Sequence, residues 1–288
     1  MSRKEIDEVT GVETTGHEWD GIKELNKPLP KWWLWTFYAT IIWSFGYWVL
    51  YPAWPTMSGY TKGVLDYSQR AVVTEQVEAA RAEQAKFRDA LAATPLDQVK
   101  DDPELLRFAM AGGATVFADN CAPCHGRGAQ GFPGYPNLND DEWLWGGTIE
   151  DIHTTIRFGI RSGHEEGRES QMPRFGIDQL LDRNQISDTA EYVLSLSGRA
   201  TDEAAVARGR EIYAEQCVAC HGEDGKGNVE LGAPNLTDAI WLYGSSKEDI
   251  VESIRTGRGG QMPPWEGRLD PVTIKSLAVY VHSLGGGQ

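Results

Sequence analysis

The hydrophobic pattern is most uneven near the N-terminus, where no charged residue occurs between Lys31 and Lys62. Residues 32–54 form a run of about 23 largely apolar residues, long enough to cross a hydrocarbon core of roughly 30 Å. Tryptophan and tyrosine gather at both ends, as expected at two membrane interfaces. We therefore predict one transmembrane helix at 32–54, preceded by a segment at 1–31. A buried helix is the alternative; a cleaved signal peptide fits poorly because the run is long and starts late.

A polar pattern follows over residues 55–102. Residues 72–91 are rich in Ala, Glu, Gln and Arg and contain neither Gly nor Pro. This composition is typical of a charged, mostly exposed helix. We predict that 55–102 is a linker containing this helix. Its role stays open between a spacer and a strut that docks against a partner.

From about residue 103 onward, the same order of polar and apolar positions occurs twice. The matching pairs include Gly113 and Gly209, Phe117 and Tyr213, Pro136 and Pro234, Trp143 and Trp241, Glu150 and Glu248, and Tyr192 and Tyr280. Each copy predicts a first, a middle and a last helix, and the middle helices start near Thr148 and Ser246. Neither copy has an alternating strand pattern. We expect an all-α protein with two tandem domains, at 103–198 and 199–288.

Both copies carry a C-x-x-C-H motif at the end of the first predicted helix. The motifs are Cys121-Ala122-Pro123-Cys124-His125 and Cys217-Val218-Ala219-Cys220-His221. This is the attachment signature of a c-type haem: two thiols on one helical turn each form a thioether, and the His ligates the iron. A zinc site or a redox C-x-x-C is the alternative, but zinc needs four ligands per site and no further cysteines exist. We predict two covalently bound haem c groups.

Each copy also offers a sixth ligand for the iron. Met172 and Met262 both lie in a Gln-Met-Pro sequence at matched positions. A thioether ligand stabilises the reduced iron and raises its potential, which suits electron transfer. Core packing is the other interpretation of a paired Met. We predict His125, Met172, His221 and Met262 as the axial ligands.

The formal net charge of −15 argues against a nucleic-acid partner. It suits either a basic soluble partner or solubility alone. Since both motifs use all the cysteines, disulfides do not report the compartment. Covalent haem attachment takes place outside the bacterial cytoplasmic membrane, so residues after the anchor are expected in the periplasm. Residues 1–31 then stay in the cytoplasm, and the protein spans the inner membrane once.

The two copies resemble the class I cytochrome c fold, in which the first and last helices cross over the haem. The leader at 15–33, TGHEWDGIKELNKPLPKWW, resembles the start of the dihaem subunit of cbb3-type cytochrome c oxidases (CcoP or FixP, subunit III). The resemblance continues through residues 51–55 and both haem repeats. It implies an electron-transfer subunit rather than an enzyme in itself. Such a subunit takes electrons from a donor cytochrome c and passes them through its two haems to the monohaem and oxygen-reducing catalytic subunits.

Further paired residues support the two haem sites. The family resemblance suggests that the carbonyls of Pro136 and Pro234 accept a hydrogen bond from the haem His. Arg157 and Arg255 are candidates to pair with haem propionates, with a solvated helix face as the alternative. Competing functions are a stand-alone membrane-anchored dihaem carrier, a dihaem peroxidase and a haem-based sensor. The last two require an exchangeable position at iron, which two Met ligands would close.

Overall fold

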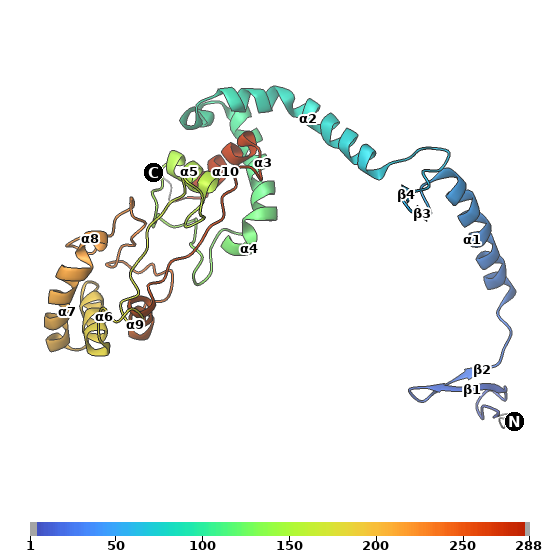
Figure 1. The fold of residues 1–288 in the computed structure, drawn as a ribbon, viewed down its shortest axis with the longest axis horizontal. Coiled ribbons are helices and arrows are strands. Elements are labelled where there is room, and N and C mark those ends of the chain that lie inside the picture. The colour runs from blue at the N-terminus through green and yellow to red at the C-terminus, as the bar shows by residue number, and fades with distance from the viewer. Residues whose placement is uncertain (1–4, 286–288) are drawn as a thin grey trace. The chain divides into compact units, whose positions relative to one another are not determined.

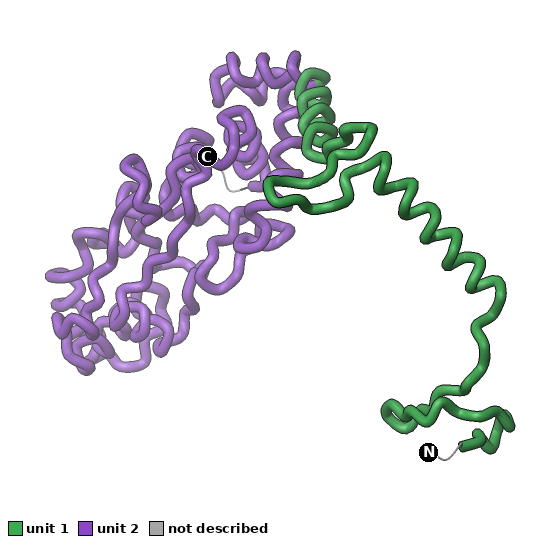
Figure 2. The backbone as a smooth tube through the Cα atoms, turned by 45° about the vertical axis from the view of Figure 1, so that its right-hand side comes forward, with its two compact units in different colours: residues 1–83 green, residues 84–288 purple. Residues whose placement is uncertain are grey.

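The computed structural model describes residues 5–285, which divide into two units with the boundary between Glu83 and Gln84 (Figure 2). The first unit contains β1 (Thr14–Trp19), β2 (Ile22–Leu25), α1 (Lys31–Leu50), β3 (Pro55–Thr56) and β4 (Gly59–Tyr60). Helix α2 (Gln69–Ala93) runs across the boundary. This helix confirms the one expected over 72–91.

Two short antiparallel hairpins, β1–β2 and β3–β4, lie in the first unit and were not expected in an all-α protein. Between β1 and β2, Asp20 and Gly21 both have positive φ, at 47° and 83°. Two positive φ values in a two-residue turn match the right-handed twist of the flanking strands, and Asp-Gly is a favoured sequence for it. The all-α prediction is therefore correct for most of the chain but misses this Asp-Gly signal.

Helix α1 occupies most of the predicted apolar run. It ends at Leu50 because Pro52 disfavours the helical conformation at Tyr51, which is extended with ψ 164°. None of its residues is buried, and Trp35 and Ile42 are each 73% exposed. Among residues 5–285, no helix is both long and apolar enough to cross a membrane.

The second unit is mostly helical (Figure 1). Its elements after α2 are η1 (Leu96–Asp101), α3 (Pro103–Asn120), α4 (Ala122–His125), α5 (Ile149–Phe158), α6 (Arg183–Ser195), α7 (Glu203–Gln216), α8 (Val218–His221), α9 (Lys247–Thr256) and α10 (Pro271–Ser283). The predicted starts of the middle helices are confirmed. Thr148 caps α5 and Ser246 caps α9, each accepting a hydrogen bond from a backbone N–H of the first turn.

The helices of the second unit form two cores that combine parts of both sequence copies. Core 1 contains α3, α5 and α10 around Phe117 and Leu277. Core 2 contains α6, α7 and α9 around Tyr213 and Ile254. Figure 1 shows the red α10 beside the green α3 and α5, and α6 beside α7 and α9. The first and last helices therefore pair across the copies, whereas the sequence predicts pairing within each copy.

The path of the chain explains this exchange. After α5 the chain leaves core 1 and enters core 2, where it forms α6 to α9; it then returns to core 1 as α10. Core 2 is thus one continuous stretch, and core 1 is made of the stretches before and after it. The nested order could not be inferred from two copies that carry the same contact residues.

Glycines allow the paired helices to approach closely at each crossing. A Cβ at Gly113 of α3 would overlap the carbonyl oxygen of Ser276 and lie 2.5 Å from Cβ of Tyr280, both on α10. The ring of Tyr280 lies 5.4 Å from that of Phe117. Gly209 makes the equivalent close approach between α7 and α6. The Gly-x-x-x-aromatic pattern is therefore the sequence signal of a helix crossing.

The end of the linker forms a third apolar cluster with α3 and α10, two helices of core 1. Leu91 at the end of α2 and Val99 in η1 have no exposed surface. Nη2 of Arg88 lies 2.7 Å from Oδ1 of Asp270, and Nζ of Lys275 donates to the carbonyl of Leu91 at 2.8 Å. Part of the linker therefore docks, and its partner is the last helix of the same chain.

Core 2 has a polar cluster where core 1 is apolar. Glu191 on α6 is 1% exposed and accepts hydrogen bonds from Nζ of Lys247 at 2.7 Å and from the N–H of Thr201 at 3.0 Å. The Lys247 hydrogen bond lowers the pKa of Glu191 to about 2. The counterpart of Glu191 in the other copy is Val279, which packs in the apolar cluster with Leu91. The linker thus packs against Val279, whereas the equivalent residue Glu191 pairs with Lys247.

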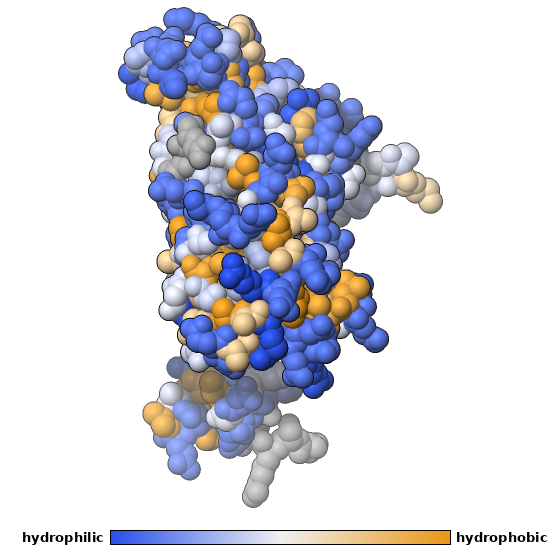
Figure 3. Space-filling view, turned by 90° about the vertical axis from the view of Figure 1, so that its left-hand side faces the viewer, coloured by the Kyte–Doolittle hydropathy of each residue, from blue (hydrophilic) through white to orange (hydrophobic). Residues whose placement is uncertain are grey.

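One face of the molecule is shown in Figure 3. Hydrophilic residues cover most of it, and the hydrophobic ones lie in smaller groups between them. This pattern agrees with the strongly negative formal charge of the chain.

Candidate functional site

The two C-x-x-C-H motifs have the same local structure. In the first, Cys121 ends α3 and the short helix α4 carries Cys124 and His125. In the second, Cys217 ends α7 and α8 carries Cys220 and His221. A glycine with positive φ ends each short helix, at 81° in Gly126 and 77° in Gly222. Each motif thus forms one helical turn, the geometry that a C-x-x-C-H attachment requires.

The hydrogen bonds predicted for the two histidines are present. Nδ1 of His125 lies 3.0 Å from the carbonyl oxygen of Pro136, and Nδ1 of His221 lies 3.1 Å from that of Pro234. Burial lowers the pKa of both histidines, although the bond to the proline carbonyl raises it. A neutral ring that donates from Nδ1 keeps Nε2 as the lone-pair nitrogen, which is the form that ligates a metal.

The first cysteine of each motif is not a reactive thiolate. Burial raises the pKa of Cys121 and of Cys217 to about 11 in both cases. Redox-active C-x-x-C motifs have the opposite property, a lowered thiol pKa. Among residues 5–285 there is also no cluster of His, Cys, Asp and Glu able to hold a metal ion. The geometry therefore disfavours the redox and zinc alternatives.

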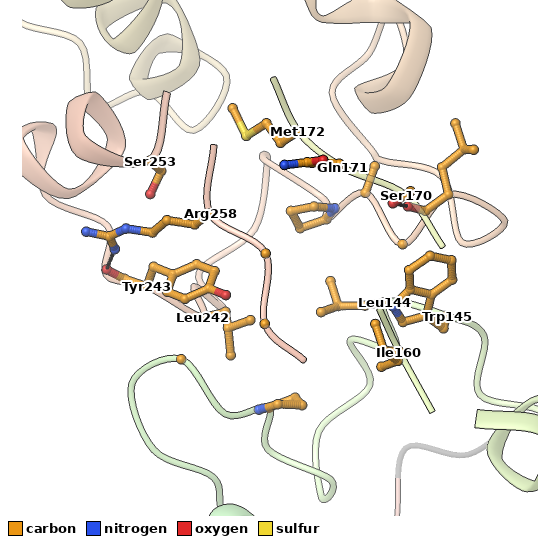
Figure 4. Close-up of a pocket in the computed structure, with 18 of the residues that line it drawn as sticks. Leu144, Trp145, Ile160, Ser170, Gln171, Met172, Leu242, Tyr243, Ser253 and Arg258 are labelled. Atoms are coloured by element: carbon orange, nitrogen blue, oxygen red, sulfur yellow. Dashed lines mark hydrogen bonds between the residues drawn. The ribbon is translucent and has the colours of Figure 1, made fainter. Parts of the chain in front are cut away.

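Both motifs open onto one continuous, mainly apolar cavity. Its lining includes the residues of the two motifs and both predicted methionines, namely Cys121, Cys124, His125, Cys217, Cys220, His221, Met172 and Met262. Figure 4 shows Met172 and Gln171 between two groups of side chains, with Trp145 and Ile160 in one and Arg258 and Tyr243 in the other. Paired thiols, a ligating His and a thioether around an apolar hollow fit a covalently attached haem.

Each candidate methionine packs in the core that holds the haem motif of the other copy, whereas the repeats predict the motif of its own copy. Met262, from the second copy, packs against core 1 together with Cys121. Met172, from the first copy, packs against core 2 together with Cys217. Two backbone hydrogen bonds join Ile160 and Met262, at 2.9 and 3.0 Å. They hold the segment that leads to α10 beside the segment that follows α5. The exchange of helices thus also exchanges the candidate sixth ligands.

The predicted propionate partners are engaged elsewhere. Nε of Arg157 donates to Glu266 at 2.7 Å, and Nε of Arg255 donates to Glu252 at 2.8 Å. Neither is among the described residues that line the cavity.

The arginines that do line the cavity are Arg161 and Arg258, which the sequence analysis missed. Both follow the Ile-Arg-x-Gly of their copy, but at offsets that differ by one residue. Strict repeat matching therefore does not pair them, and a search for any Arg after that glycine would have found both.

Aromatic side chains from each copy reach toward the other. Trp145 and Tyr243 both line the cavity, and a Cβ on Gly232 would overlap the ring of Trp145. Trp241 also lines the cavity, and its Nε1 donates to the carbonyl of Asp238 at 3.1 Å. Trp143 instead packs against core 1. Of this matched pair, Trp241 lines the cavity and Trp143 does not.

The haem-attachment motifs and their proline-bound histidines define a c-type cytochrome. Residues 110–197 match the family model for cytochrome c, and residues 204–281 match the model for cytochrome c oxidase, cbb3-type, subunit III. Residues 11–58 match the N-terminal domain of cytochrome oxidase-cbb3, FixP.

The similarity to curated relatives extends over nearly the full length of the chain. It is 58% identical to the cbb3-type oxidase subunit FixP of Azorhizobium caulinodans, covering 98% of this chain and 96% of that protein. It is 54% identical to subunit CcoP of Cereibacter sphaeroides, covering 96% and 95%. The chain therefore belongs to the FixP/CcoP family of cbb3-type cytochrome c oxidase subunits.

Proposed function

We propose that the chain relays electrons within a cbb3-type oxidase through two covalently bound haem c groups. The observation that carries this proposal is the single cavity onto which both C-x-x-C-H motifs open. When bound, haem c supplies a one-electron iron couple. The chain holds the two groups by Cys121, Cys124, Cys217 and Cys220, and the apolar lining excludes water from the space between the motifs.

The axial ligands are His125 with Met262 and His221 with Met172. The support is that each methionine packs in the same core as the cysteine of the motif to which it is assigned. The proline carbonyls orient the two imidazole rings. Closed coordination on both sides favours electron transfer over peroxidase or sensor chemistry.

The proposed membrane anchor is the apolar run 32–54, of which α1 forms the larger part, in contact with lipid and crossing the inner membrane once. Support comes from its exposed apolar side chains, from the aromatic residues near both ends, and from the family match over 11–58. The N-terminal segment then faces the cytoplasm and the haem domains face the periplasm, where haem is attached.

The partners are the monohaem and catalytic subunits of the oxidase and a donor cytochrome c. Support comes from the relatives, which are named as subunits of a cbb3-type cytochrome c oxidase. The net charge of −15 favours a basic donor. Oxygen reduction and proton pumping are functions of the whole complex, to which this subunit delivers electrons.

The assignment to the complex is tested by blue-native gels of solubilised membranes, stained for c-type haem and for oxidase activity. We expect this chain in a large band that also consumes oxygen. Migration only as a small free species would contradict the oxidase role and support the stand-alone carrier.

The ligand pairing is tested in a variant that keeps only the second haem, with Cys121 and Cys124 replaced by alanine. Near-infrared magnetic circular dichroism then reports one methionine–iron signature. In this background Met172→Ala removes the signature and Met262→Ala leaves it, if the ligands cross between the copies. The reverse result would restore the pairing within each copy.

A further inference from the structure

Arg161 lies between the two segments that carry the Gln-Met-Pro sequences, residues 170–173 and 260–263. Nε of Arg161 donates to the carbonyl of Ser170 at 2.7 Å, and Nη1 donates to the carbonyl of Gly260 at 2.8 Å. Ser170 is two residues before Met172, and Gly260 is two residues before Met262. A single guanidinium therefore bonds the carbonyl two residues before the methionine in both Gln-Met-Pro segments.

The local backbone is built around this side chain. Arg161 has φ 48°, in the left-handed region that non-glycine residues rarely adopt. Its N–H donates to the carbonyl of Arg168 at 2.8 Å, which closes the loop and fixes this conformation. On the other strand, a Cβ at Gly259 would lie 3.1 Å from Nε of Arg161, so a glycine leaves room for the guanidinium.

The described residues of the second copy form no equivalent bridge. Arg258 also lines the cavity, but its Nη1 donates to the carbonyl of Tyr243 at 3.2 Å, away from either methionine strand. Its guanidinium lies 5.1 Å from the ring of Tyr243. Figure 4 shows Arg258 and Tyr243 joined by this hydrogen bond, on the opposite side of the cavity from Ser170. Arg258 is therefore a matched control: a cavity arginine that bonds one carbonyl.

We propose that Arg161 is a positioning residue for both axial methionines, so that one side chain sets the sixth ligand of both irons. The proposal rests on the ligation by Met172 and Met262 proposed above. The planar fork of a guanidinium can bond two carbonyls with fixed directions, which an ammonium group cannot reproduce. Loss of the fork removes a hydrogen bond from both Gln-Met-Pro segments at once, and weaker thioether ligation would lower both iron potentials.

The test uses the full chain in the purified oxidase, with Arg161→Ala compared to Arg258→Ala. Near-infrared magnetic circular dichroism measures the methionine signature, and redox titration measures the midpoint potential of each haem. For Arg161→Ala we expect a smaller methionine signature from both haems and lower potentials for both. Added guanidinium at non-denaturing concentration should restore part of the signature. Arg258→Ala should retain both signatures.

Three results would overturn the proposal. The first is a methionine signature that Arg161→Ala leaves intact at both haems, even if one potential shifts, because that indicates a purely electrostatic contact. The second is a loss confined to one haem. The third is an equal loss in Arg258→Ala. Failure of the ligand assignment itself is distinguishable, because the unmodified protein would then lack the methionine signature.

Discussion

The crossing of α3 and α10 can be tested at two neighbouring glycines of α3. A Cβ at Gly113 would overlap the carbonyl of Ser276 and lie 2.5 Å from Cβ of Tyr280, whereas non-bonded carbon atoms pack at about 3.5–4.0 Å. A Cβ at Gly112 would meet its nearest atom, Oγ of Ser276, at 3.8 Å, an ordinary contact. The change from glycine to alanine is chemically the same at both positions.

The expected magnitudes follow from these distances. Alanine is favoured over glycine within a helix by about 1 kcal/mol at either position. At Gly113, overpacking costs about 1–3 kcal/mol in addition, because α10 must move away from α3. The difference in unfolding free energy between Gly112→Ala and Gly113→Ala therefore isolates the overpacking cost. In a unit of this size, each kcal/mol corresponds to about 2–4 °C in Tm.

Thermal unfolding of the detergent-solubilised protein, followed by Soret absorbance, measures this difference. We expect Gly112→Ala to be as stable as the unmodified protein or more so, and Gly113→Ala to unfold at a lower temperature than Gly112→Ala. Equal Tm values for the two variants would refute the close crossing of α3 and α10. So would a lower value for Gly112→Ala.

Other parts of the fold give three further predictions. Glu191→Gln should destabilise the protein by about 3 kcal/mol at pH 7, from the pKa lowered from 4.5 to about 2. Because this pKa is depressed, the stabilisation is present above about pH 4.5 and fades as the pH falls toward 2. Denaturant unfolding should therefore show a larger difference in unfolding free energy between the variant and the unmodified protein at pH 7 than at pH 3. Arg88→Ala should weaken the docking of the linker by about 1 kcal/mol and speed its proteolysis, whereas Arg81→Ala, on an exposed stretch of α2, should not. An exported fragment of residues 160–258 should fold around one haem, whereas 199–288 should not, since it lacks α6; the opposite result in haem-stained gels would contradict the nested order.

Local chemistry made much of the site predictable from sequence. The positions of the C-x-x-C-H motifs, the proline carbonyls and the capped helix starts all depend on residues close in the chain. The pairing of helices does not: Tyr192 and Tyr280 are equivalent residues, and either could face Gly113. Only the tertiary path after Gly159 decides between them.

The match between Arg157 and Arg255, whose side chains do not line the cavity, has a related cause. Their carbonyls make equivalent bonds, from the N–H of Glu266 at 3.0 Å and from the N–H of Gly176 at 3.1 Å. Repeat matching detected a shared backbone contact, which does not by itself assign a function to the two side chains. Matched positions in a repeat are therefore stronger evidence for a shared backbone structure than for a shared side-chain function.

The nested order of the two cores has a consequence for biogenesis. If the part of the chain after the proposed anchor is exported in sequence order, the first haem motif emerges before the second. Core 2 nevertheless has all its helices once α9 has emerged, while core 1 still lacks α10. The first motif to leave the translocation channel is therefore the last to be enclosed. A chain broken off before residue 271 would carry a complete core 2 and an incomplete core 1, a state that proteases can recognise.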